Sequence, residues 1–154
     1  MITIADTLTA DRVELASTAP DHRTAIALVA DLLHNAPDVL DWPALYEGLR
    51  GSCPCLAESD GAFAICLPHA RTDAVAAMVM SVGRFDAGVT FPGCAPLVRY
   101  IFCIGVPKAL ANDYLRIVGL LARILKEPAA EAQLHTAATP RDFLARLSAL
   151  EAKL

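Results

Sequence analysis

One short stretch of the sequence combines residues that can carry out chemistry. The apolar run at residues 62–67 (AFAICL) leads directly into Pro68 and His69, and Arg71 follows two residues later. Pro68 has a fixed φ that stiffens the turn, and functional groups in α/β sheets gather just beyond the carboxyl ends of strands. A neutral imidazole attacks phosphorus well, and a nearby guanidinium stabilises a transferred phosphoryl group. His69 with Arg71 is therefore a candidate phosphoryl acceptor; the alternative is a surface histidine at a strand-to-loop corner.

A second hypothesis combines the same histidine with cysteines. Cys66 and His69 form a C-x-x-H pair, and Cys53 and Cys55 form a C-x-C pair, so three thiolates and an imidazole would suit tetrahedral zinc. This spacing differs from that of the common structural zinc sites. Cys66 also lies inside an apolar run, where cysteine behaves as a small hydrophobic residue. The pattern therefore favours a site without metal.

A tyrosine at the start of a later helix is a further candidate. Tyr114 lies at the N-terminal end of the helix expected in residues 111–128, where the helix dipole favours an anion. Its hydroxyl can point at a site, or its ring can simply extend the apolar face of that helix. His22, His34 and His135 are isolated on expected helices and receive no role. Because Gly-rich phosphate loops and the G-x-S-x-G elbow are absent, the sequence indicates no nucleotide chemistry.

Helices that must position these residues are indicated by apolar periodicity and capping residues. They are expected at residues 21–37, 41–51, 111–128 and from Thr139 onward. Asp21 is the expected N-cap of the first helix, and Asn112 or Asp113 that of the third. Thr139 is the expected N-cap of the last helix, and Pro140 follows it. Proline favours this first helical position.

Strands are indicated by near-continuous apolar runs at residues 62–67, 74–83 and 97–106. Residues 1–16 are expected to form a short strand or extended lead-in. Residues 51–61 are expected to be a loop, and 84–96 to be rich in turns, although Val89, Thr90 and Phe91 could form a short extended piece. Strands that are apolar throughout are covered on both faces, so we expect an α/β fold with a mixed sheet flanked by helices on both faces.

Length, composition and charge set broad limits. The 154 residues, of which 55% are hydrophobic, fit one domain spanning 1–154 with a sizeable core. No apolar run reaches the roughly 20 residues of a membrane span, and no signal peptide is indicated, so a cytoplasmic protein is expected. The net charge of −4 argues against nucleic acid and would suit a basic protein partner. Five cysteines, an odd number, predict reduced thiols in a reducing compartment.

The segment ICLPHAR resembles the active-site segment of enzyme IIA of the bacterial phosphotransferase system, in the fructose/mannitol group that includes the nitrogen-regulatory branch. In that family an apolar strand precedes Pro-His-Gly and then Lys or Arg. The likeness covers nearly the whole chain. It includes DHRTAIALVADLLHNAP as the first helix, LYEGLRGS as the end of the second, LVRYIFCIGVPKALANDYLRIVGLLARIL as a strand and the helix behind the site, and the closing AATPRDFLARLSALE.

The resemblance implies a function as well as a mixed sheet flanked by helices. His69 would accept a phosphoryl group from the phosphocarrier HPr, which is itself charged from phosphoenolpyruvate. The group would then pass to a IIB domain, or the phosphorylation state would set which target proteins are bound. Arg71, Tyr114, Ser52 and Arg50 are the expected phosphate-binding or supporting residues, and no metal or other cofactor is expected.

Departures from the family pattern support an alternative. Ala70 stands where the family usually has glycine, Tyr114 where a second histidine usually lies, and Glu47 where an arginine is common, although Arg50 is close by. The Gly-rich loop of the family is replaced by CPCLAESDG. A tyrosine hydroxyl can still bond a phosphate oxygen, whereas an inward Glu47 would repel it. The alternative function is a degenerate IIA-like module that binds a regulated protein without carrying phosphate.

Overall fold

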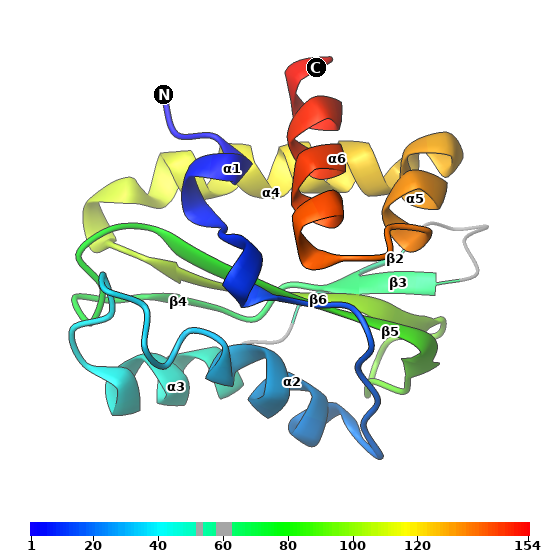
Figure 1. Cartoon of the computed structure of the whole chain (residues 1–154). Coiled ribbons are helices and arrows are strands. Elements are labelled where there is room, and N and C mark those ends of the chain that lie inside the picture. Colours follow the sequence, from blue (N-terminus) through cyan, green and yellow to red (C-terminus); the bar gives the residue numbers. More distant parts are fainter. Residues whose placement is uncertain (52–53, 58–62) are drawn as a thin grey trace.

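The sheet at the centre of the fold is mixed, with helices on both faces (Figure 1). It is seen in a computed structural model that describes residues 1–51, 54–57 and 63–154. Within these residues the strand order is β1 (Val13–Glu14), β5 (Val79–Val89), β6 (Leu97–Val106), β3 (Phe63–Cys66) and β2 (Cys55–Ala57), and β4 (His69–Arg71) also pairs with β6. Strands β3 and β4 run parallel to β6, whereas β5 is antiparallel to it. The predicted fold class is therefore confirmed.

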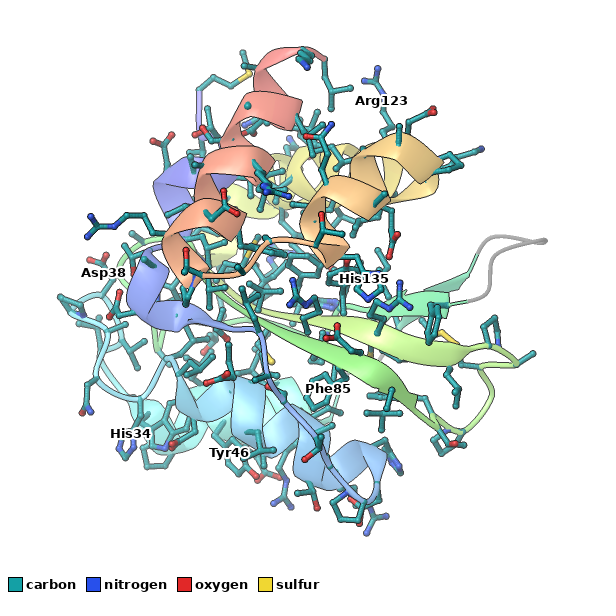
Figure 2. All side chains as sticks on the ribbon, turned by 45° about the vertical axis from the view of Figure 1, so that its right-hand side comes forward. His34, Asp38, Tyr46, Phe85, Arg123 and His135 are labelled. Carbon is teal, nitrogen blue, oxygen red and sulfur yellow. A yellow bond between two sulfur atoms is a disulfide. The ribbon has the colours of Figure 1, made fainter. Side chains whose placement is uncertain are left out.

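Two apolar cores lie on opposite faces of the sheet. One face is covered by α1 (Ile4–Thr7), α4 (Ala111–Lys126), α5 (Pro128–His135) and α6 (Pro140–Ala152), and the other by α2 (His22–Asp31) and α3 (Trp42–Arg50). Side chains of β6 alternate between these cores, with Phe102 in the first and Ile101 in the second. Phe85 of β5 belongs to the second core and points toward α2 (Figure 2). Burial on both faces is the reason that β6 is apolar throughout.

Side-chain caps begin α2 and α6 as their sequences predict, and α3 also begins with a side-chain cap, that of Asp41. The Asp21 carboxylate accepts from the Thr24 N–H at 2.8 Å, and the Thr139 hydroxyl accepts from the Asp142 N–H at 3.1 Å. The hydrogen bonds from Thr24 hold the pKa of the Asp21 carboxyl below its usual value. These bonds satisfy N–H groups that have no partner within the helix.

The start of α4 differs from its prediction. A short 3-10 turn, η2 (Lys108–Leu110), leads directly into this helix, and Leu110 occupies the N-cap position without a side-chain cap. The predicted cap at Asn112 or Asp113 is therefore wrong, because both residues already lie inside the first turn. Helix α4 ends at Lys126, and Pro128 then occupies the first turn of α5.

The N-terminal segment is mostly helical, and its prediction as a strand or extended lead-in is wrong except at β1. Thr3 and Asp6 form a capping box, in which the Thr3 N–H donates to Asp6 at 2.8 Å and the Asp6 N–H donates to the Thr3 hydroxyl at 3.1 Å. This local pairing begins α1, and a 3-10 turn, η1 (Ala10–Arg12), follows before β1.

Two strands extend into segments that composition assigns to loops. Strand β5 begins at Val79, not at 74, and continues to Val89 through the predicted turns. Its pairing with β6 shifts register between Arg84 and Val89, and Gly88 there has a φ of 78° that favours glycine. Strand β2 lies inside the predicted loop at 51–61, because it pairs with β3. Pairing with a distant strand outweighs local composition in both segments.

Thr139→Ala is expected to destabilise the fold by about 1 kcal/mol. The substitution removes the acceptor for the Asp142 N–H and leaves the backbone of α6 otherwise unchanged. Urea unfolding followed by circular dichroism measures the change, and Thr139→Ser, which keeps the hydroxyl, is the matched control. An unfolding midpoint that does not move in Thr139→Ala would contradict the importance of this cap.

Candidate functional site

His69 opens a strand of its own. Leu67 and Pro68, both buried, link the end of β3 to β4, and the Pro68 carbonyl accepts from the Ile104 N–H at 2.9 Å. His69 itself is half-buried and pairs in register with Ile104 of β6. The sequence predicts that the histidine lies in a turn after a strand. In the structure this turn is hydrogen-bonded to β6 through Pro68 and through the pairing of β4. The imidazole is thus held by backbone bonds on both of its sides in the chain.

The protonation pattern of the imidazole follows from one contact. Nδ1 of His69 lies 2.9 Å from the carbonyl oxygen of Leu67. A carbonyl oxygen only accepts hydrogen bonds, so Nδ1 carries the proton and Nε2 of the neutral ring carries the lone pair. Nε2 is therefore the nitrogen of His69 that can act as a nucleophile.

Tyr114 of α4 stacks on His69. The two ring centroids are 4.8 Å apart with an angle of 28° between the planes. Burial raises the pKa of the Tyr114 phenol above its ordinary value, so at neutral pH the hydroxyl stays protonated and can donate a hydrogen bond. The ring also packs against the apolar core beneath α4. This packing agrees with an extension of the apolar face, and the stacking places Tyr114 beside His69, while its role as a site group stays a prediction.

Arg71 places a cation on the same strand as His69. Residues two apart in a strand point to the same face, so Arg71 projects on the side of the imidazole. Its Nε donates to the carbonyl of Lys108 at 3.1 Å. Lys108 lies in η2, the turn directly before α4. Because Nε of Arg71 makes this bond, the two terminal nitrogens of its exposed guanidinium are the groups that can bind an anion. Lys108 adds a second cation nearby, although its Nζ lies 3.2 Å from Asp73.

Arg50 and Glu47 lie on α3 and are paired with each other. The Arg50 Nε is 3.4 Å from a Glu47 carboxylate oxygen, and its guanidinium lies over the Tyr46 ring at 5.9 Å from the centroid. Both members of the pair are largely exposed. The pairing partly offsets the charge of Glu47 that would repel phosphate. Ser52, the remaining predicted supporting residue, lies outside the described residues.

Ala70, which departs from the family's glycine, fits against a glycine on the facing helix. Ala70 of β4 is buried with 7% of its surface exposed. A Cβ placed on Gly48 of α3 would lie only 2.6 Å from the Cβ of Ala70. The methyl group of Ala70 therefore occupies space that Gly48 leaves open. Sequence reasoning singles out Ala70 but misses Gly48, because only the packing of α3 on β4 brings the two together.

A disulfide joins Cys55 to Cys94, with their Cα atoms 6.2 Å apart. The prediction of reduced thiols is therefore wrong for this pair, since the fold brings the start of β2 next to the segment that precedes β6. Cys55 then offers no thiolate to zinc, and Cys66 is fully buried. Cys53, the other predicted ligand, lies outside the described residues. Among the described residues no group of three His, Cys, Asp or Glu side chains is placed to hold a metal ion.

The described helices include none that is both long and apolar enough to cross a membrane.

Comparison with known proteins adds independent information. Residues 6–149 match the family described as "Phosphoenolpyruvate-dependent sugar phosphotransferase system, EIIA 2". The fructose-specific EIIA component of the PTS system from Haloferax volcanii is 32% identical over 105 residues, which are 66% of this chain and 66% of that protein. The chain thus matches slightly less than two thirds of the length of this curated relative.

Solved structures share the fold over nearly all of the chain. Nitrogen regulatory protein IIA-Ntr from Neisseria meningitidis has a TM-score of 0.79 at 19% identity, covering 94% of this chain and 98% of that one. Enzyme IIAMTL from Escherichia coli, in its complex with phosphorylated enzyme IIBMTL, has a TM-score of 0.74 at 18% identity, covering 93% and 98%.

Proposed function

Since the chain belongs to the EIIA 2 family of the phosphoenolpyruvate-dependent sugar phosphotransferase system, we propose that it is a phosphocarrier that accepts a phosphoryl group on Nε2 of His69. The observation that carries this proposal is the contact between Nδ1 and the Leu67 carbonyl. In the neutral ring this contact assigns the proton to Nδ1 and the lone pair to Nε2, so that Nε2 is the nitrogen that can attack phosphorus.

The transfer itself is an in-line displacement at phosphorus. Nε2 forms the new N–P bond while the N–P bond of the donor's phosphohistidine breaks, and the electron pair of that bond returns to the donor imidazole. Positive charge develops on the His69 ring, and the Nδ1–H bond to the Leu67 carbonyl stabilises it. The guanidinium of Arg71 and the Tyr114 hydroxyl supply donors for the phosphoryl oxygens. The protein therefore acts by positioning and by charge stabilisation.

The proposed partners are proteins. An HPr-type phosphocarrier is the donor, and a IIB domain or a regulated target protein is the downstream partner. The structure of IIAMTL with phosphorylated IIBMTL, a protein of the same fold in complex with a phosphorylated partner, supports this class of partner. We place the protein, as a single IIA domain of residues 1–154, in the cytoplasm, where phosphoenolpyruvate is available.

The test is phosphorylation by a reconstituted donor chain. The protein is incubated with phosphoenolpyruvate, enzyme I and either the sugar-system HPr or its nitrogen-branch counterpart, and its intact mass is measured. The expected result is the addition of one phosphoryl group that is lost in acid and kept in alkali, as for phosphohistidine. Comparison of the two donors identifies the branch. No addition from either donor would overturn the proposal and favour a module that acts by binding alone.

Tyr114→Phe is expected to slow phosphorylation of His69 about tenfold. A hydrogen bond to a charged group contributes about 1.5 kcal/mol, and phenylalanine removes the donor while it keeps the ring stacked on His69. Single-turnover transfer from phosphorylated HPr measures the rate. Tyr114→His, which restores the residue type usual in the family, is the matched control and is expected to transfer at least as fast as the native protein. An unchanged rate in Tyr114→Phe would show that the hydroxyl does not contact the phosphoryl group.

A further inference from the structure

The disulfide lies at the edge of the sheet that carries the candidate site. Cys55 is the first residue of β2, and Cys94 lies in the segment between β5 and β6. Both residues are partly buried against the core beneath α2 and α3. The bond spans 39 positions of the chain, and the enclosed segment contains His69. The disulfide therefore links β2 to a part of the chain beyond the histidine.

A continuous series of bonds connects this disulfide to the imidazole. Pro54 directly precedes Cys55, and its carbonyl accepts from the Leu67 N–H at 3.0 Å. The carbonyl of the same residue, Leu67, accepts from Nδ1 of His69 at 2.9 Å. In the antiparallel pairing of β2 with β3, Cys55 also lies opposite Cys66, the residue before Leu67. The peptide groups that orient the imidazole are thus fixed by the strand that the disulfide anchors.

In the part of the chain that the structure describes, strand β2 pairs with a single strand. It is three residues long, lies at the edge of the sheet and pairs with β3. Short edge strands open more readily than central strands, because fewer backbone bonds and apolar contacts hold them. A covalent bond from its first residue to the segment before β6 therefore restrains the position of the Pro54 carbonyl.

We propose that the Cys55–Cys94 disulfide is a redox-controlled positioning element for His69. When the disulfide is formed, Pro54 holds the Leu67 peptide, Leu67 holds Nδ1–H, and Nε2 presents its lone pair. When the disulfide is reduced, the end of β2 is released, the Nδ1–H form is populated less, and phosphoryl transfer slows. This inference rests on the proposed function of His69 for its effect on transfer, but its effect on the imidazole is independent of that function.

The redox step is a thiol–disulfide exchange. A dithiol reductant attacks one sulfur of the pair, the S–S bond breaks, and a mixed disulfide forms. The second thiol of the reductant then displaces the remaining protein sulfur. The protein gains two electrons and two protons and holds two thiols, while the reductant becomes a cyclic disulfide. A small-molecule disulfide reverses the reaction by accepting the two electrons and leaving as two thiols.

The first measurement follows the imidazole itself. The protein is labelled with ¹⁵N-histidine, and long-range ¹H–¹⁵N correlation spectra of His69 are recorded before and after reduction by dithiothreitol. The ¹⁵N shifts distinguish a protonated from an unprotonated ring nitrogen. The oxidised protein is expected to show Nδ1–H, and the reduced protein a mixture that includes Nε2–H. A disulfide with only a general structural role would not change this tautomer.

The second measurement follows transfer from phosphorylated HPr. Reduction is expected to lower the single-turnover rate about 2- to 10-fold, which is the factor that one ordinary hydrogen bond contributes. The double variant Cys55→Ser/Cys94→Ser is expected to transfer at the rate of the reduced protein, and dithiothreitol is expected not to change that rate. Cys103→Ala, a change at a buried cysteine of β6, is the matched control and is expected to keep the response to reduction.

The outcomes separate the two proposals. The same tautomer and the same rate in both redox states would overturn the redox inference, and so would peptide mapping that shows Cys94 bonded to Cys53. A tautomer that changes on reduction in a protein that never gains phosphate would overturn the proposed function and support the positioning element. If the double serine variant does not fold, the native protein with and without dithiothreitol still decides the question.

Discussion

His69→Ala is expected to abolish phosphorylation by phosphoenolpyruvate, enzyme I and HPr. The substitution removes the nitrogen nucleophile, and no neighbouring group in the described site replaces it, since Tyr114 keeps a protonated phenol. Intact mass and acid-labile phosphate are measured in parallel on the native and variant proteins. The native protein is expected to carry one phosphoryl group and the variant none.

Other histidines provide matched controls for this experiment. His34 and His135 lie on opposite sides of the sheet (Figure 2). His34 stacks on Trp42, and His135 lies 3.5 Å from Asp86. Alanine at either position is expected to leave the phosphate in place. Phosphate that persists in His69→Ala and disappears in one of these controls would assign the acceptor role to a different histidine.

His69→Ala is expected to keep the native fold, so that its loss of phosphorylation reports the loss of the nucleophile. The side chain is only half-buried, and the backbone of β4 keeps its pairing with β6 whatever residue stands at this position. Circular dichroism and a urea midpoint close to those of the native protein would confirm this. A variant that unfolds would call for His69→Gln, which keeps much of the side-chain volume without a nucleophilic imidazole.

Gly48→Ala is expected to lower the free energy of unfolding by about 2 kcal/mol. The new Cβ would lie 2.6 Å from the Cβ of buried Ala70, a distance at which α3 or β4 must move. The cost of this overlap exceeds the gain of about 1 kcal/mol that alanine brings to a helix interior. Because β4 begins at His69, we also expect slower phosphorylation. Urea unfolding and single-turnover transfer measure the two effects.

A second helical glycine and a rescuing substitution make this prediction specific. Gly119 of α4 has open space where its Cβ would lie, so Gly119→Ala is expected to keep or raise stability. Ala70→Gly removes the methyl group that Gly48→Ala would strike, and the double variant is expected to recover most of the lost stability. Stability losses of Gly48→Ala and Ala70→Gly that simply add in the double variant would contradict a direct contact between the two side chains.

The contact between Gly48 and Ala70 bears on the departure from the family pattern at Ala70. The methyl group of Ala70, directly after His69, would crowd a side chain on the facing helix, and in this chain that helix has glycine at the point of contact. The departure therefore does not argue against phosphoryl transfer. The Tyr114 departure is similar, because the tyrosine ring stacks on the imidazole and its phenol stays protonated, as the proposed donor role requires.

The amino-acid sequence by itself determined the features that depend on neighbours within a few residues. The caps at Asp21 and Thr139, the extent of β6 at 97–106 and the Pro-His step after β3 are all local. A cap needs only the next three residues, and an apolar run needs only its own side chains. These local features were sufficient to predict the fold class and to single out His69 as the candidate phosphoryl acceptor.

Tertiary structure alone decided the features in which distant segments meet. Strand β2 forms because β3 lies beside it, and β5 continues to Val89 because β6 offers the hydrogen bonds. The Cys55–Cys94 bond and the tautomer of His69 depend on backbone positions that are set by the whole sheet. The physical reason is that each of these contacts joins groups that the fold must first bring together, so no local pattern of residue types encodes them.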